Sequence, residues 1–235
     1  MREPKLQRHR VVLFQAALVL VAGAFALLTF LVKTRSSFTL DLQITKVIQS
    51  LDVPLFAWLM NLVSWPGFSP QAMIVTGLIV LLLYSFGLRW EALTALTTAL
   101  SSTALNVLVK SLVQRPRPLP DMVTVLATLN SYSFPSGHVM FYVSFFGFIG
   151  LLAYSLLKPS FQRILLLIFF GALVVLIGIS RVYLGQHWAS DVLGAYLLGC
   201  LTLVANIQLY RWGKTRFFVQ QPITAGKTAS QKEIA

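Results

Sequence analysis

His187 and Asp191 form the pair of residues with the clearest chemical potential in this chain. They stand four positions apart at the start of an apolar stretch, so a helix would place both side chains on one face. A carboxylate beside an imidazole selects the tautomer and leaves the other ring nitrogen free to act as a nucleophile or base. The alternative is an acid that only favours a helix dipole. Asp191 is the single acidic residue in the last three apolar stretches, which favours the chemical role.

A second histidine ends the run Pro135-Ser136-Gly137-His138, which immediately precedes another apolar stretch. A turn that leads into a helix N-terminus presents backbone N–H groups to an anion. Gly137 allows close backbone approach, Ser136 adds a hydroxyl donor, and His138 could protonate a leaving oxygen. As an isolated string of four residues, this run is also ordinary turn chemistry.

Three basic residues add positive charge to the same set. Lys110 stands near the end of an apolar stretch, Arg117 follows in the next loop before a proline, and Arg181 ends the stretch that precedes His187. An arginine fork matches phosphate oxygens, and several cations together neutralise a phosphoryl group. For Arg181 alone, a side chain that extends to the membrane interface is the simpler interpretation. We interpret Arg115, two positions before Arg117, as a solvated interfacial charge.

The chain has no acidic cluster of the kind that holds Mg²⁺ at a phosphate, and no Cys/His spacing typical of zinc. A covalent phosphohistidine route fits the groups that are present: a histidine paired with a carboxylate, a second histidine as proton donor, and three cations. We therefore expect no metal and no cofactor.

The composition is that of an integral membrane protein. Of 235 residues, 57% are hydrophobic and 11% are charged, with a mean hydropathy of +0.76. Soluble domains carry about 25% charged residues. The net charge of +12 is concentrated at the two ends of the chain, outside the apolar stretches, which fits anionic headgroups better than nucleic acid. We expect membrane lipids as partners and no nucleic acid.

Six apolar stretches are long enough to cross about 30 Å of hydrocarbon as helices. They cover residues 11–33, 71–87, 91–113, 139–157, 163–182 and 190–210. Segment 41–65 alternates polar and apolar residues and is interrupted by Pro54, so an interfacial or re-entrant helix pair is expected there. The predicted fold is all-α: an integral membrane helical bundle of six transmembrane helices, with interfacial helices between the first two spans.

The domain organisation follows from these spans. We expect a basic cytoplasmic N-terminus over 1–10, the six-span unit over 11–210, and a basic, disordered cytoplasmic tail over 211–235. With both termini inside, twelve Lys and Arg residues fall on the cytoplasmic side and seven on the other. This distribution follows the positive-inside rule and places all three polar clusters outside. A plasma (inner) membrane protein of a bacterium is expected, with its active site facing outside or the periplasm.

In order and spacing, the three clusters resemble the signature of the type 2 phosphatidic acid phosphatase family: K-x6-R-P, P-S-G-H and S-R-x5-H-x3-D. Every specified position matches. The resemblance implies that His187 takes the phosphoryl group, that Asp191 orients His187, and that His138 protonates the leaving group and then activates water. It also implies that five residues hold the substrate phosphate: Lys110, Arg117, Ser136, Gly137 and Arg181.

The resemblance implies a membrane lipid phosphatase and leaves its lipid substrate open. Phosphatidic acid, phosphatidylglycerol phosphate and an isoprenyl pyrophosphate such as undecaprenyl pyrophosphate all fit. A lipid phosphotransferase with the same site is one alternative, because the same chemistry can pass the phosphoryl group to an alcohol. A small transporter is a second alternative, which the clustering of charges at one interface and the lack of an internal repeat disfavour.

Overall fold

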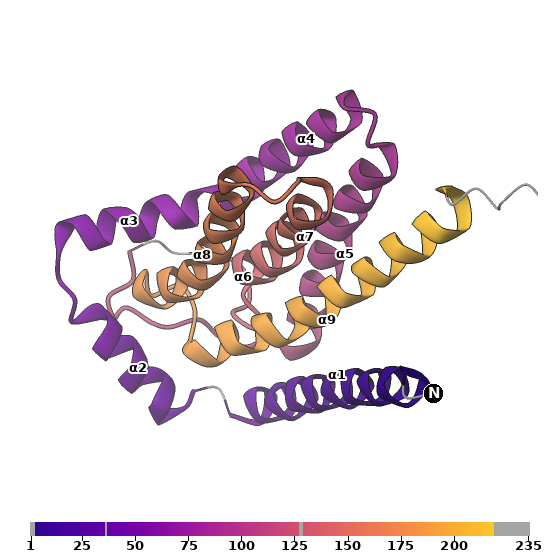
Figure 1. Ribbon diagram of the computed structural model, residues 1–235. Helices are drawn as coiled ribbons and strands as arrows, with labels where there is room; N and C mark the ends of the chain where they lie inside the picture. Colours follow the sequence, from indigo (N-terminus) through magenta and orange to yellow (C-terminus); the bar gives the residue numbers. More distant parts are fainter. Residues whose placement is uncertain (1–2, 36, 127–128, 219–235) are drawn as a thin grey trace, which may run out of the picture.

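The computed structural model describes residues 3–35, 37–126 and 129–218, and within these ranges the regular structure is entirely helical (Figure 1). The α-helices are α1 (Glu3–Thr34), α2 (Thr39–Gln49), α3 (Pro54–Ser64), α4 (Ser69–Ser85), α5 (Arg89–Val113), α6 (Gly137–Phe141), α7 (Gly147–Leu156), α8 (Phe161–Tyr183) and α9 (Ala189–Gly213). A 3₁₀ turn (Trp65–Gly67) joins α3 to α4, and π-helical turns follow α6 (Tyr142–Phe146) and α9 (Lys214–Phe218).

Five of these helical segments are long and apolar enough to cross a membrane: α1, α5, the continuous α6–α7 segment, α8 and α9. The remaining expected span corresponds to α4, which is apolar over 17 residues. At 1.5 Å per residue it reaches about 25 Å, somewhat less than a typical hydrocarbon core. The expected all-α membrane bundle is therefore confirmed, and α4 is shorter than each of the five segments that meet the length of a span.

Helices α2 and α3 lie between the first two expected spans and are bent by 119° relative to one another. The bend falls where Pro54 begins α3, because proline suits the first turn of a helix and not its interior. This is the helix pair that the alternating polarity of segment 41–65 predicts. Helix α2 packs against α8 and α9, and α3 packs against α8.

The α6–α7 segment is the central helix of the bundle. Its buried side chains, among them Met140, Tyr142, Phe145 and Phe148, are almost completely inaccessible, and α5, α8 and α9 pack around it. In contrast, α1 lies along α9 at the edge of the bundle and exposes most of its apolar surface (Figure 1). Such surface is stable only in lipid, which agrees with an integral membrane protein.

Helical structure extends beyond the expected boundaries of the six-span unit. At the N-terminus α1 already begins at Glu3, within the segment expected to precede the first span. At the C-terminus α9 continues to Gly213 and a π-helical turn follows to Phe218, so helix covers the start of the segment that was expected to be disordered. The rest of that segment, 219–235, lies outside the described residues.

Substitution of Gly194 in α9 offers a test of the close packing beside the polar clusters. A Cβ at this position would overlap the fully buried ring of Phe134, which precedes the Pro135-Ser136-Gly137 turn. We expect Gly194→Ala to lower stability by about 1–3 kcal/mol, because the packed ring must shift. Gly77 of α4 is the matched control, since a Cβ there meets open space. Thermal unfolding in detergent should show a lower midpoint for Gly194→Ala only; equal midpoints for the two variants would contradict this packing.

Candidate active site

The ends of four helices bring the three polar clusters together. Successive long helices run in alternating directions, so the C-terminal ends of α5 and α8 meet the N-terminal ends of α6 and α9. A cavity of about 460 Å³ opens at this point between α4, α5 and α6. Five of the eight predicted site residues line it: Lys110, Arg117, Gly137, His138 and His187. The other three, Ser136, Arg181 and Asp191, are completely buried.

His187 and Asp191 face one another, but the local structure differs from the expected helical face. Helix α9 begins only at Ala189, so His187 lies in the loop before it and Asp191 occupies the third helical position. There the carboxylate turns back and accepts a hydrogen bond of 2.9 Å from the backbone N–H of Trp188. As a result Nδ1 of His187 lies 3.6 Å from Oδ2 of Asp191. At this distance the interaction is electrostatic rather than a hydrogen bond.

The other ring nitrogen of His187 points toward the cations. Nε2 lies 3.2 Å from Nη1 of Arg117. Because a guanidinium can only donate, Nε2 must accept, and the ring proton is then on Nδ1, toward Asp191. This is the tautomer that makes Nε2 a nucleophile.

Burial and neighbouring positive charge keep the His187 ring neutral. Burial is the larger cause that lowers its pKa well below 6.5, and the charges of Arg117, Lys110 and Arg181 lower it further. At neutral pH Nε2 is therefore not protonated. Burial also lowers the pKa of Arg117, to about 10, while Asp191 opposes this shift. Arg117 accordingly remains charged at neutral pH.

Lys110 and Arg117 are held by the backbone of segment 131–133. Nζ of Lys110 donates to the carbonyl oxygen of Tyr132, and Nε of Arg117 donates to that of Ser131 at 2.7 Å. Nη1 of Arg117 also donates to the carbonyl oxygen of Gln186 at 2.5 Å, beside His187. This loop thus fixes two cations next to the ring, a role that the sequence alone did not indicate.

Several buried donors beside the cavity have no hydrogen-bond partner within the part of the chain that the structure describes. They are Oγ of Ser136, Nε2 of His138, Nε and Nη2 of Arg181, and Nδ1 of His187. Buried polar groups are nearly always hydrogen-bonded, and an unpaired one costs free energy. Donors of this kind, grouped around one cavity with two further cations, suit an anion with several oxygen atoms.

The connection between α3 and α4 packs over the same residues, which the sequence also did not predict. Oγ of Ser64 accepts a hydrogen bond from Nη1 of Arg181. The Phe68 ring lies edge-on to His138, with centroids 4.8 Å apart, and a Cβ on Gly67 would overlap the His138 ring. Glycine at position 67 is therefore needed for His138 to lie where it does. Ser64 and Arg181 are 117 residues apart, so no local pattern could have paired them.

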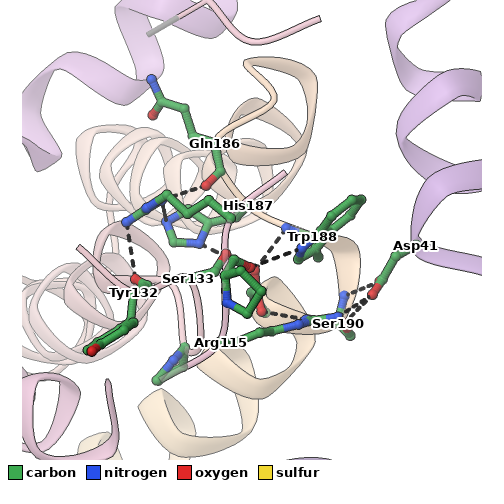
Figure 2. Close-up of polar contacts among 12 residues, drawn as sticks. Asp41, Arg115, Tyr132, Ser133, Gln186, His187, Trp188 and Ser190 are labelled. Atoms are coloured by element: carbon green, nitrogen blue, oxygen red, sulfur yellow. Dashed lines mark hydrogen bonds and ion pairs between the residues drawn. The ribbon is translucent and has the colours of Figure 1, made fainter. Parts of the chain in front are cut away.

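The interpretation of Arg115 as a solvated interfacial charge is wrong. Its side chain is 1% exposed and forms ion pairs with Asp41 at 2.8 Å and with Asp191 at 2.6 Å (Figure 2). The left-handed conformation of Gln114, with φ of 56°, ends α5 immediately before Arg115. The spacing to Lys110 selected Arg117 correctly, but it gave no sign that Arg115 turns inward.

Comparison with known proteins agrees with the motif analysis. The family model described as PAP2 superfamily matches residues 91–215. Phosphatidylglycerophosphatase B of Bacillus subtilis is 37% identical over 116 residues, 48% of this chain and 54% of that protein. Undecaprenyl-diphosphatase of Sulfolobus acidocaldarius is 34% identical over 82 residues, 35% of each chain. The chain thus spans about half, or less, of the curated relatives that it matches.

Two solved structures share the fold. The crystal structure of a transmembrane PAP2 type phosphatidylglycerolphosphate phosphatase from Bacillus subtilis has a TM-score of 0.75 and 28% identity, and the match covers 85% of this chain and 98% of that one. The structure of Aquifex aeolicus LpxE has a TM-score of 0.59, covers 74% and 98%, and at 20% identity supports the fold alone. The resemblance to the phosphatase family is confirmed.

The lowered pKa of His187 predicts a pH dependence of stability. In the folded chain the ring stays neutral, whereas in the unfolded chain it binds a proton as the pH falls through about 6.5. Stability contributed by the neutral ring is therefore present above pH 6.5 and is lost below it. We expect the unfolding midpoint of the wild type to fall between pH 7.5 and pH 5 more steeply than that of His187→Asn. Parallel pH profiles of the two proteins would contradict this.

Proposed function

Because the chain belongs to the PAP2 superfamily, we propose that it is a membrane lipid phosphatase that hydrolyses a lipid phosphomonoester or diphosphate without a metal. One observation carries the proposal: a neutral, acid-backed His187 presents Nε2 to a cavity that is also lined by Lys110, Arg117 and His138. Nucleophile, proton donor and phosphate-binding cations are thereby gathered within one site.

The proposed reaction has two steps. Nε2 of His187 attacks phosphorus, the bond from phosphorus to the lipid oxygen breaks, and His138 gives that oxygen a proton. Asp191 stabilises the positive charge on the phosphorylated ring. Then His138, now a base, takes a proton from water, whose oxygen displaces His187 and releases inorganic phosphate. The contact between Arg117 and Nε2 must give way to one with a phosphoryl oxygen, which lies within the same reach.

The walls of the cavity suit a lipid. Apolar side chains of α4, α5 and α6 form part of their lining: Ala72, Met73, Val107 and Phe141. An acyl or isoprenyl chain can lie along this surface while its phosphate reaches His187. We propose phosphatidylglycerol phosphate as the first substrate to test, since a curated relative and a structural relative are named for that activity. Undecaprenyl pyrophosphate follows, from the second curated relative.

Phosphate release from purified protein in detergent tests the proposal. The panel comprises phosphatidylglycerol phosphate, phosphatidic acid and undecaprenyl pyrophosphate. Free phosphate formed from at least one of them supports hydrolysis. Transfer of the phosphoryl group to an added alcohol without free phosphate would favour the phosphotransferase, and no reaction of any kind would contradict the proposed function.

The two residues of the nucleophilic pair should differ in their effects. We expect His187→Ala to reduce turnover to background, because the covalent route is lost. Asp191→Asn should keep a residual rate, lower than wild type by roughly 10²- to 10⁴-fold, because the ring loses orientation and charge stabilisation. His9→Ala, at an exposed position of α1, is the matched histidine control and should keep full activity. Wild-type turnover in His187→Ala would exclude the mechanism.

Metal removal and a phosphate analogue separate this mechanism from metal-dependent ones. Among the described residues, no group of three or more His, Cys, Asp and Glu side chains could hold a metal ion. We expect EDTA to leave phosphate release nearly unchanged and vanadate to inhibit it, since vanadate mimics a five-coordinate phosphoryl group. If EDTA abolished activity and Mg²⁺ restored it, the reaction would depend on a metal and the proposed mechanism would be wrong.

We further propose that the site faces outward from a bacterial inner membrane. The support is the distribution of basic residues: Arg89, Lys158 and Arg163 lie at the opposite end of the bundle from the site. In a Cys200→Ser background, Thr124→Cys near the site should react with a membrane-impermeant maleimide in intact cells. Ser160→Cys, in the exposed connection between α7 and α8, should react only after lysis. The reverse pattern would overturn the orientation.

A further inference from the structure

The carboxylate of Asp191 is held on both oxygen atoms by groups other than His187. Oδ1 accepts from Nη1 of Arg115 at 2.6 Å, while Oδ2 accepts from the backbone N–H of Trp188 at 2.9 Å and from the hydroxyl of Ser133. Oδ2 is also the atom that faces the ring of His187. The direction in which Asp191 presents its charge to His187 is therefore set largely by these donors.

Arg115 is in turn fixed by Asp41 of α2. Nη2 of Arg115 donates to Oδ2 of Asp41 at 2.8 Å, and the guanidinium lies over the rings of Phe38 and Trp188 at 5.5 and 5.9 Å. Both charged groups of the ion pair are almost completely buried. The fork of Arg115 thus points one nitrogen at each carboxylate and has little freedom to rotate.

Ser190 closes the network. Its backbone N–H and its hydroxyl donate to the two oxygens of Asp41, at 2.8 and 2.6 Å, and its hydroxyl accepts from Nη1 of Arg115 at 2.7 Å. Three separate parts of the chain are joined in this way: α2, the loop after α5, and the first turn of α9 (Figure 2).

Energetics favours a positioning role over a stabilising one. Burying an ion pair costs desolvation free energy, and the attraction between the two charges often only offsets that cost. Replacement of the pair by apolar side chains often leaves the protein as stable. What the network does provide is a fixed geometry. With two carboxylates and one guanidinium it also carries one formal negative charge in excess, beside the ring that becomes positive when it takes a phosphoryl group.

We propose that Asp41 and Arg115 are positioning residues for the reaction: the chain Asp41–Arg115–Asp191 sets the carboxylate that orients His187. This inference rests on the proposed function, since it concerns the rate of that reaction. It makes helix α2, far from the motifs in sequence, a part of the catalytic apparatus. Asp41 and Arg115 act through Asp191 and do not themselves touch the substrate.

Helix α2 is also attached to the bundle by contacts outside this network. A substitution in one of those contacts provides a matched control. Nε2 of Gln49, at the other end of α2, donates to the carbonyl oxygens of Thr124 and Tyr183 at 2.7 and 2.9 Å. Gln49→Ala therefore weakens the attachment of α2 without touching Asp191. Asp52→Asn, at an exposed position between α2 and α3, controls for the loss of an acidic charge.

The experiment measures kcat and KM of the full-length protein in detergent, with the lipid phosphate that the wild type hydrolyses fastest. We expect Asp41→Asn to lower kcat roughly tenfold with KM changed by less than about twofold, because ground-state binding is unaffected. Arg115→Gln should lower kcat further, and Arg115→Lys should recover part of the loss by restoring one charge. Gln49→Ala and Asp52→Asn should keep wild-type kcat.

Combination with Asp191→Asn separates positioning from a structural role. If Asp41 acts through Asp191, then Asp41→Asn should cause little further loss of kcat in the Asp191→Asn background. A structural role predicts the same fold loss in both backgrounds, and that result would overturn the inference. So would an unchanged kcat in folded Asp41→Asn protein, checked by size-exclusion chromatography and thermal unfolding.

Two further outcomes are separable. If Arg115→Gln fails to fold, Asp41→Asn and Ser190→Ala decide the matter, since neither removes the ion pair between Arg115 and Asp191; Ser190→Ala should lower kcat less than Asp41→Asn does. Wild-type protein that releases no phosphate from any lipid would refute the proposed function itself. If the wild type is active and both Asp41→Asn and Ser190→Ala keep the wild-type kcat, only the positioning role is refuted.

Discussion

Burial of charge at one end of an apolar bundle is the constraint on which the rest of the structure depends. Arg115, Arg181 and Asp191 are each no more than 1% exposed. Ionised groups in such surroundings cost several kcal/mol unless partners compensate them. The helix ends must therefore converge so that each charge meets a carboxylate, a backbone carbonyl or a ligand. The bundle satisfies some of these groups and leaves others without a partner among the described residues.

The division between satisfied and unsatisfied groups explains the architecture of the site. The guanidinium of Arg115 is buried against two carboxylates and a serine hydroxyl, and Arg115 does not line the cavity. Arg181 has one hydrogen bond, to Ser64, and two further donor positions that no described residue occupies. The two buried arginines therefore differ: Arg115 contacts Asp191, whereas Arg181 keeps donors without a partner among the described residues.

The helices outside the motifs contribute more than an anchor. The α3–α4 connection covers the site through Ser64, Gly67 and Phe68, and α2 contributes Asp41. The α6–α7 segment is the central helix, and its N-terminus carries His138 between α4 and α5. A lipid that enters along α4 and α5 would therefore bring its phosphate to a site built from the ends of α5, α6 and α8, the loop before α9 and the α3–α4 connection.

The sequence by itself determined the fold class, the apolar helices and the motif residues that surround the cavity. Those features are local: hydrophobic length decides whether a helix crosses a membrane, and the alternation of successive spans decides that the ends of α5, α6, α8 and α9 meet. The tertiary structure alone decided the partners of the buried charges. Asp41 and Arg115 are 74 residues apart, and nothing in either neighbourhood indicates the other. Their pairing depends on how α2 folds back against α9, which is a matter of packing and not of sequence pattern.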